Sequence, residues 1–188
     1  MTDFPTRRDA LLATALIAAA GGAATTAGAA TGATGHEHDW DWFIGEWTVR
    51  HRYLKARLGG SGEWLEFDGT TSFRTLMGGL ANVDDNILNK PDGTYRAATV
   101  RAFDARDGLW RIWWLDGRSP TTLDPPVAGG FKDGVGHFFG EDTLAGKPIK
   151  VRFIWSDISA RTARWEQSFS SDAGQTWEPN WVMAFSRA

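Results

Sequence analysis

The stretch Ile149-Lys150-Val151-Arg152-Phe153-Ile154-Trp155-Ser156 decides the fold class. Its odd-numbered positions are all large and apolar, whereas its even-numbered positions are mostly polar. Successive side chains of a strand point to opposite faces, so this period of two predicts a strand with one buried face. The same period recurs from residue 41 onward, and helical spacing is nearly absent. The sequence therefore predicts an all-β protein.

Strands of this kind follow one another at short intervals. We expect roughly nine or ten, of which the clearest span residues 47–58, 62–75, 80–88, 94–104, 109–116, 134–142, 149–156, 161–171 and 181–187. Pairs such as Gly59-Gly60 and Asp107-Gly108 supply the backbone angles of tight hairpins between them. The proline-containing segment Ser119–Gly130 is expected to be a loop that covers one end. A sandwich and a closed up-and-down barrel would both protect the strand edges.

The first 40 residues follow a different pattern. The pair Arg7-Arg8 directly precedes a weakly apolar run over 10–20 and resembles a twin-arginine export signal. We expect a signal peptide over 1–29, a flexible lead over 30–40 and one domain over 41–188. This organisation predicts a periplasmic or secreted protein.

Composition argues against several classes of partner. The net charge of −3, with both signs mixed along the chain, gives no basic face for nucleic acid or a membrane surface. No apolar run beyond the signal approaches the ~20 residues of a spanning helix. The absence of cysteine excludes disulfides and thiolate ligands. The chain has 11 Trp but only 2 Tyr, which predicts a surface lined with indoles. We expect a small-molecule partner, and a homodimer stays open.

Gly45-Glu46-Trp47 resembles the G-x-W motif that opens the first strand of lipocalins and the wider calycin barrels. The segment from Asp41 to Arg187 is similar to a bacterial family of calycin-like domains of unassigned function. This resemblance implies a single antiparallel up-and-down barrel of lipocalin type. It also implies that Trp47 closes the barrel floor and that Arg187 stacks on it.

A related calycin branch, the nitrobindins, binds haem through a histidine late in the barrel. The four histidines here are His36, His38, His51 and His137, and none lies in the last strands. Haem has no evident ligand, and we expect no cofactor.

Two further motifs have structural explanations. The run Ser170-x-Asp172-x-Gly174-x-Thr176-Trp177 resembles the Asp-box of β-propellers, and a single copy predicts a hairpin turn rather than a glycosidase. The run His36-Glu37-His38-Asp39 carries metal-binding donors but lies in the expected lead, where supporting contacts are lacking. We expect no metal site.

Alternation selects the candidate pocket residues. If Trp47 points inward, His51 and Tyr53 do so as well. Polar groups in phase with indoles on other strands suggest selectivity, and Arg101 would offer a cation to an anionic ligand. The candidates are His51, Tyr53, Trp64, Glu66, Asn82, Asp84, Arg101, Trp114, Asp116 and Trp155.

Three functions are compatible with these residues. The preferred hypothesis is an exported barrel that binds an aromatic or amphipathic small molecule in a Trp-rich pocket. The alternative is an isomerase or hydrolase in which His51 acts as acid or base beside a carboxylate such as Asp84 or Glu66. The third is a structural or interaction barrel whose core is filled by its own indoles.

Overall fold

The computed structural model describes residues 35–60 and 62–188. The expected signal peptide and the first part of the lead lie outside these residues. The elements are η1 (Asp41–Phe43), β1 (Gly45–Leu54), β2 (Trp64–Leu76), η2 (Met77–Gly79), β3 (Ala81–Lys90), β4 (Gly93–Asp104), β5 (Leu109–Asp116), β6 (Val127–Lys132), β7 (Val135–Leu144), β8 (Lys147–Ser156), β9 (Thr162–Ser170) and β10 (Glu178–Arg187). Within the described ranges, no helix is long and apolar enough to cross a membrane.

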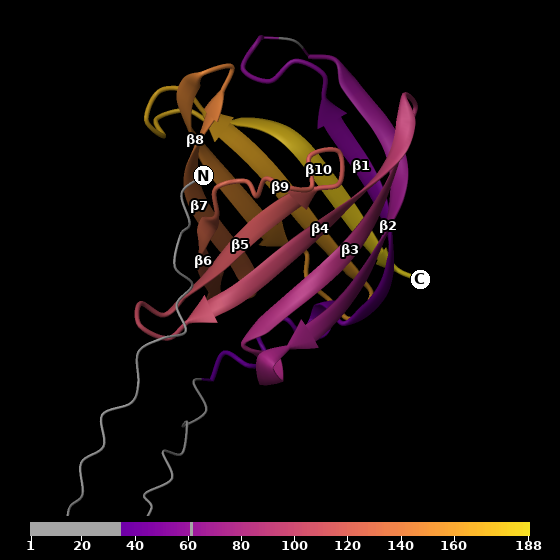
Figure 1. Ribbon diagram of the computed structural model, residues 1–188, viewed down its shortest axis with the longest axis vertical. Coiled ribbons are helices and arrows are strands. Elements are labelled where there is room, and N and C mark those ends of the chain that lie inside the picture. Colours follow the sequence, from indigo (N-terminus) through magenta and orange to yellow (C-terminus); the bar gives the residue numbers. More distant parts are fainter. Residues whose placement is uncertain (1–34, 61) are drawn as a thin grey trace, which may run out of the picture. The chain divides into compact units, whose positions relative to one another are not determined.

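Ten strands form a closed antiparallel barrel, as Figure 1 shows. Each strand pairs with the next one along the chain, and β10 returns to pair with β1. The closing register joins Trp47 to Arg187 and Tyr53 to Trp181. The prediction of an all-β, up-and-down barrel is confirmed, and the sandwich is excluded.

The strand that the sequence analysis missed is β6. We expected a loop over Ser119–Gly130, but only its first part is irregular, and Val127 begins a strand that pairs with β5 and β7. Gly129 and Gly130 interrupt the alternation of apolar and polar side chains by which the other strands are predicted. A Cβ at Gly129 would lie 1.9 Å from the His137 carbonyl oxygen, so the close approach of β6 and β7 requires glycine at this position.

An aromatic plug fills the end of the barrel at which β1 begins. Trp40, Phe43 and Trp47 are almost completely buried there, and the Trp47 indole donates to the Phe43 carbonyl at 2.7 Å. Trp40 packs edge-on against Phe131 at 4.9 Å between ring centroids and against Trp155 at 5.7 Å. We call this set, Trp40, Phe43 and Trp47, the floor.

The part of the expected flexible lead that is described, from Gly35 to Trp40, contacts the barrel. Asp39 organises it: its carboxylate accepts from the Trp110 indole at 2.8 Å and contacts His36 Nδ1 at 2.8 Å. The His36 ring stacks on Phe103 at 4.3 Å. The flexible-lead prediction is therefore corrected for these residues, because Trp40 anchors them with a side chain only 1% exposed.

Arg187 seals the floor from outside. Its guanidinium lies 3.9 Å from the centroid of Trp47, donates to the Trp42 carbonyl at 2.8 Å and also bonds the Ile44 carbonyl. The resemblance to lipocalins implied this stacking, and it is confirmed. The guanidinium group of Arg187 thus binds two carbonyl groups and stacks on one ring at the point where the first and last strands meet.

The opposite end of the barrel is the mouth, which includes the segments 55–60, 117–126 and 171–177 and the turns 91–92 and 145–146. The segment 171–177 is the expected Asp-box hairpin: Asp172 accepts from the Thr176 backbone at 2.9 Å, and the Trp177 indole donates to the Gly174 carbonyl at 3.1 Å. The hydrogen bonds that Asp172 accepts from the Thr176 hydroxyl, the Thr176 backbone and the Ser170 hydroxyl lower its pKa below the usual range. The motif shapes a turn, as predicted.

Replacing Arg187 by Ala should lower the free energy of unfolding by about 2 kcal/mol, since a cation–π contact and charge-assisted hydrogen bonds are lost together. Urea denaturation measures this change. Arg50→Ala is the matched control, because Arg50 forms only exposed ion pairs with Glu66 and Asp68. Equal effects of the two substitutions would contradict a special role for Arg187.

Candidate functional site

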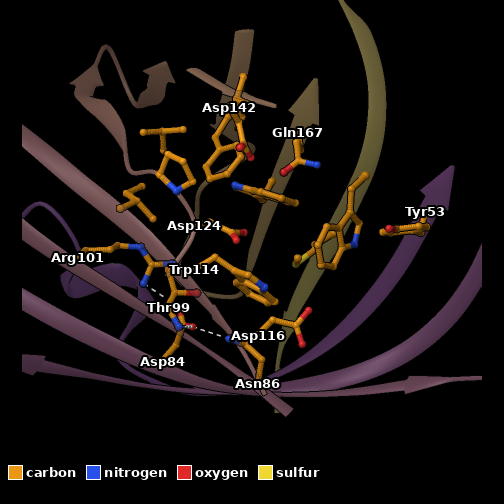
Figure 2. A pocket seen from close by; sticks show the side chains of 18 of the residues that line it. Tyr53, Asp84, Asn86, Thr99, Arg101, Trp114, Asp116, Asp124, Asp142 and Gln167 are labelled. Atoms are coloured by element: carbon orange, nitrogen blue, oxygen red, sulfur yellow. Dashed lines mark hydrogen bonds and ion pairs between the residues drawn. The ribbon is translucent and has the colours of Figure 1, made fainter. Parts of the chain in front are cut away.

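A cavity of about 200 Å³ lies inside the barrel, open toward the mouth. Figure 2 shows it from close by. Its lining comes from all strands except β2 and from the loops at the mouth: Tyr53, Arg57, Asp84, Asn86, Tyr95, Thr99, Arg101, Ile112, Trp114, Asp116, Arg118, Asp124, Pro125, Val127, Asp142, Val151, Phe153, Trp155, Trp165, Gln167, Phe169, Trp181, Met183 and Phe185.

Indoles form one wall of the cavity. Trp114 and Trp165 both meet Trp181 edge-on, at 5.7 Å and 5.6 Å between ring centroids. Strand alternation positions them, because Trp165, Gln167 and Phe169 share the inner face of β9. These rings give the cavity an apolar wall that suits an aromatic or apolar group.

A buried ion pair lies at the inner end of the cavity. The Asp84 carboxylate accepts from Arg101 Nη1 at 2.7 Å, from Asn86 Nδ2 at 2.6 Å and from the Thr99 backbone at 3.1 Å. Arg101 also donates to Asn82 at 3.2 Å and lies 4.6 Å from the Trp40 ring. Its side chain is only 3% exposed. Because Asp84 neutralises Arg101, this cation has no unpaired charge to offer a ligand, contrary to the sequence-based hypothesis.

Both tyrosines of the chain lie at the mouth beneath arginines. Arg57 lies 4.3 Å from the Tyr53 ring, and Arg118 lies 4.0 Å from the Tyr95 ring. Burial raises the pKa of Tyr95 to about 12, so its phenol stays neutral. Arg118 is paired with Asp116 at 2.6 Å. Two phenols, each in contact with a guanidinium group, therefore lie at the mouth.

Two further carboxylates, those of Asp124 and Asp142, line the cavity (Figure 2). Asp124 belongs to the loop 117–126, which is held by the hydrogen bond from the Asp124 backbone to the Trp114 carbonyl at 3.1 Å. Burial raises the pKa of Asp124, and the nearby charges of Asp142 and Asp116 raise it further. Asp124 thus stands in a negative potential.

His51 points inward as expected but does not line the cavity. Its Nδ1 accepts from the Trp181 indole at 3.2 Å, and its ring stacks on Phe67 at 4.5 Å. A Cβ at Gly69 would lie 2.7 Å from His51 Nε2, so the glycine makes room for the ring. Burial lowers the pKa of His51 to about 4. It is a neutral packing residue, and the pairing of His51 with Asp84 as acid and base is corrected.

Trp64 and Glu66 lie on the outer face of β2, away from the cavity. Glu66 pairs there with Arg50 at 3.0 Å, and Arg52 lies 4.9 Å from the Trp64 ring. Their inward assignment is corrected, because the direct pairing of His51 with Phe67 turns the odd-numbered residues of β2 inward. Asn82 is fully buried beside Arg101 and does not line the cavity.

Six of the candidates are brought together around the cavity: Tyr53, Asp84, Arg101, Trp114, Asp116 and Trp155. The main residues that the sequence analysis missed are Arg57, Asp124, Asp142, Trp165, Gln167 and Trp181. Alternation along β9 and β10 could have identified Trp165, Gln167 and Trp181. The loop residues Arg57 and Asp124 carry no such periodic signal. Within the described ranges, no cluster of three His, Asp or Glu side chains is arranged to hold a metal ion.

No family model and no curated protein sequence matches the chain. Among solved structures, it is similar to the S-type phycobiliprotein lyase CPES from Guillardia theta, with a TM-score of 0.54 and 7% sequence identity. The similarity covers 81% of this chain and 92% of the lyase chain. It supports the calycin-like, lipocalin-like barrel and is too distant to transfer any residue role.

His51 should make the protein less stable in acid. Below pH 6.5 the unfolded chain binds a proton on this residue, whereas the folded chain does so only near pH 4. The free energy of unfolding should therefore fall by about 2–3 kcal/mol through this residue between pH 7 and pH 4.5. His51→Gln keeps an acceptor for Trp181 but should reduce that fall, as measured by urea titrations at both pH values.

The control for this comparison is His137→Gln, since His137 is exposed. It should retain the full dependence of stability on pH. If His51→Gln and wild type lose equal stability in acid, His51 is not the buried neutral group that the packing indicates.

Proposed function

We propose that the protein binds a small aromatic or amphipathic molecule inside its barrel. The cavity of about 200 Å³ beside Trp114, Trp165 and Trp181 carries this proposal. A dry cavity of ~150 Å³ in another protein holds benzene, so a ligand of one or two rings is the appropriate size. The polar groups around the rim would set its orientation.

The rival functions receive less support. A barrel filled by its own indoles would not leave this cavity beside three of them. The isomerase or hydrolase hypothesis rested on His51, which is occupied by its contact with Trp181. The similarity to a lyase concerns the fold alone. It is compatible with a barrel that binds a small molecule and does not favour catalysis over binding.

Filling the cavity should abolish binding. Val151 points into it from β8. Ligands would be found by titrating the intrinsic fluorescence against a metabolite library, and Val151→Phe should weaken their binding by ten-fold or more. Ile154→Phe is the matched control, because Ile154 belongs to the same strand but does not line the cavity. A folded wild type whose emission responds to no compound would refute the proposal.

Export belongs to the same proposal. The pair Arg7-Arg8 before an apolar run supports a twin-arginine signal. Replacing both arginines by Lys should retain the protein in the cytoplasm, as cell fractionation and immunoblotting would measure. Unchanged export of the double variant would contradict the twin-arginine route and leave the binding proposal untouched.

A further inference from the structure

The charge balance of the cavity points to the charge of its ligand, given the binding function proposed above. Three arginines and four aspartates line the cavity, so negative charge is in excess by one. Asp84 neutralises Arg101 at 2.7 Å, and Asp116 neutralises Arg118 at 2.6 Å. The remaining charged groups are Arg57, Asp124 and Asp142.

Arg57 offsets one of the two remaining carboxylates in formal charge but forms an ion pair with neither of them. Its guanidinium lies over the rings of Tyr53, at 4.3 Å, and Phe169, at 5.3 Å, and among the described residues it has no ion pair. The faces of these rings attract the cation and hold it there. The charges of Asp142 and Asp116 shift the pKa of Asp124 more than the charge of Arg57 does.

The Asp124 carboxylate has no hydrogen-bond or ion-pair partner among residues 35–60 and 62–188, although its backbone is fixed by the bond to Trp114 at 3.1 Å. The adjacent bridge between Leu115 and Leu123 holds the same loop against β5. The loop thus holds the backbone of Asp124 in place, and its exposed carboxylate, unpaired within the described ranges, lines the cavity together with Trp114. A carboxylate without a partner in the protein can accept charge-assisted hydrogen bonds from a cationic group of a ligand.

Gln167 supplies a second acceptor that faces the cavity. Its side chain is 92% buried, being only 8% exposed, and its Nε2 donates to Asn180 at 2.8 Å. Its Oε1 has no partner within the part of the chain that the structure describes, and Figure 2 shows this oxygen turned toward the cavity. An acceptor in this position can take a hydrogen bond from a donor on the molecule that fills the cavity.

We propose that the ligand is a small aromatic or amphipathic amine in its protonated form, with its ammonium group at Asp124 and its apolar body against Trp114, Trp165 and Trp181. Asp142 adds negative potential, and Gln167 accepts a hydrogen bond from a donor on the ligand. Indole faces also stabilise a nearby cation. An anionic ligand would meet the excess of carboxylates, and Arg101 is already neutralised by Asp84.

A matched series of phenylethylamine, phenylethanol and phenylpropionate tests the charge preference. The three share one ring and differ at the end group, which is a cation, a neutral hydroxyl or an anion. By calorimetric titration at neutral pH, the amine should bind about ten-fold more tightly than the alcohol, and the acid most weakly. Asp124→Asn should remove most of the amine's advantage and leave the affinity for the alcohol unchanged.

Two further variants complete the experiment. Asp142→Asn should reduce the preference for the amine in the same direction, and it replaces Asp124→Asn if that variant fails to fold by circular dichroism. Asp133→Asn is the control, because Asp133 lies in the turn between β6 and β7 and does not line the cavity. It should bind all three compounds as wild type does.

Equal binding of the amine, the alcohol and the acid, or an amine preference that survives both Asp124→Asn and Asp142→Asn, would overturn this inference and leave the proposed binding function intact. Failure of all three compounds to bind wild type would also overturn it. The binding function itself is decided separately, by the library titration and by Val151→Phe.

Discussion

The pairing of β1 with β10 is the constraint on which the rest of the structure depends. It closes ten strands into a ring and commits alternate residues of every strand to the interior. An eight-stranded barrel is about as wide as its own side chains can fill, so ten strands leave excess space. At one end, Trp40 and Phe43, which precede β1, fill that space. At the other end no side chain of the described residues fills that space, and the cavity is the result.

Much of this architecture could be predicted from the sequence, because a closed barrel requires apolar inward residues to alternate with outward residues along each strand. The alternation over Ile149–Trp155 identifies β8 and its inner face correctly. The turn around Asp172 follows from a local motif, and the stacking of Arg187 on Trp47 follows from the resemblance to lipocalins. These features depend on neighbours in sequence or on one ring and one cation.

The misassigned residues depend on contacts between distant segments. Along β2 both faces carry large apolar groups, so Trp64 and Phe67 are equally plausible inward residues until pairing with His51 sets the phase. Trp40 lies before the first strand, where no alternation marks it for burial. Asp124 is brought to the cavity by a loop that is held against β5 by a backbone bond to Trp114 and by the bridge between Leu115 and Leu123. Tertiary contacts supplied the information in each case.

Arg187 has a topological consequence. By binding the carbonyls of Trp42 and Ile44, it holds the last strand beside the residues that lead into the first one. The chain therefore enters and leaves the ring at the same place, and the ring of ten strands has no structurally privileged beginning. A circular permutant joined near the floor and opened in a loop at the mouth would keep every strand pairing. The order of the strands along the gene and their order around the barrel are thus separable properties of this molecule.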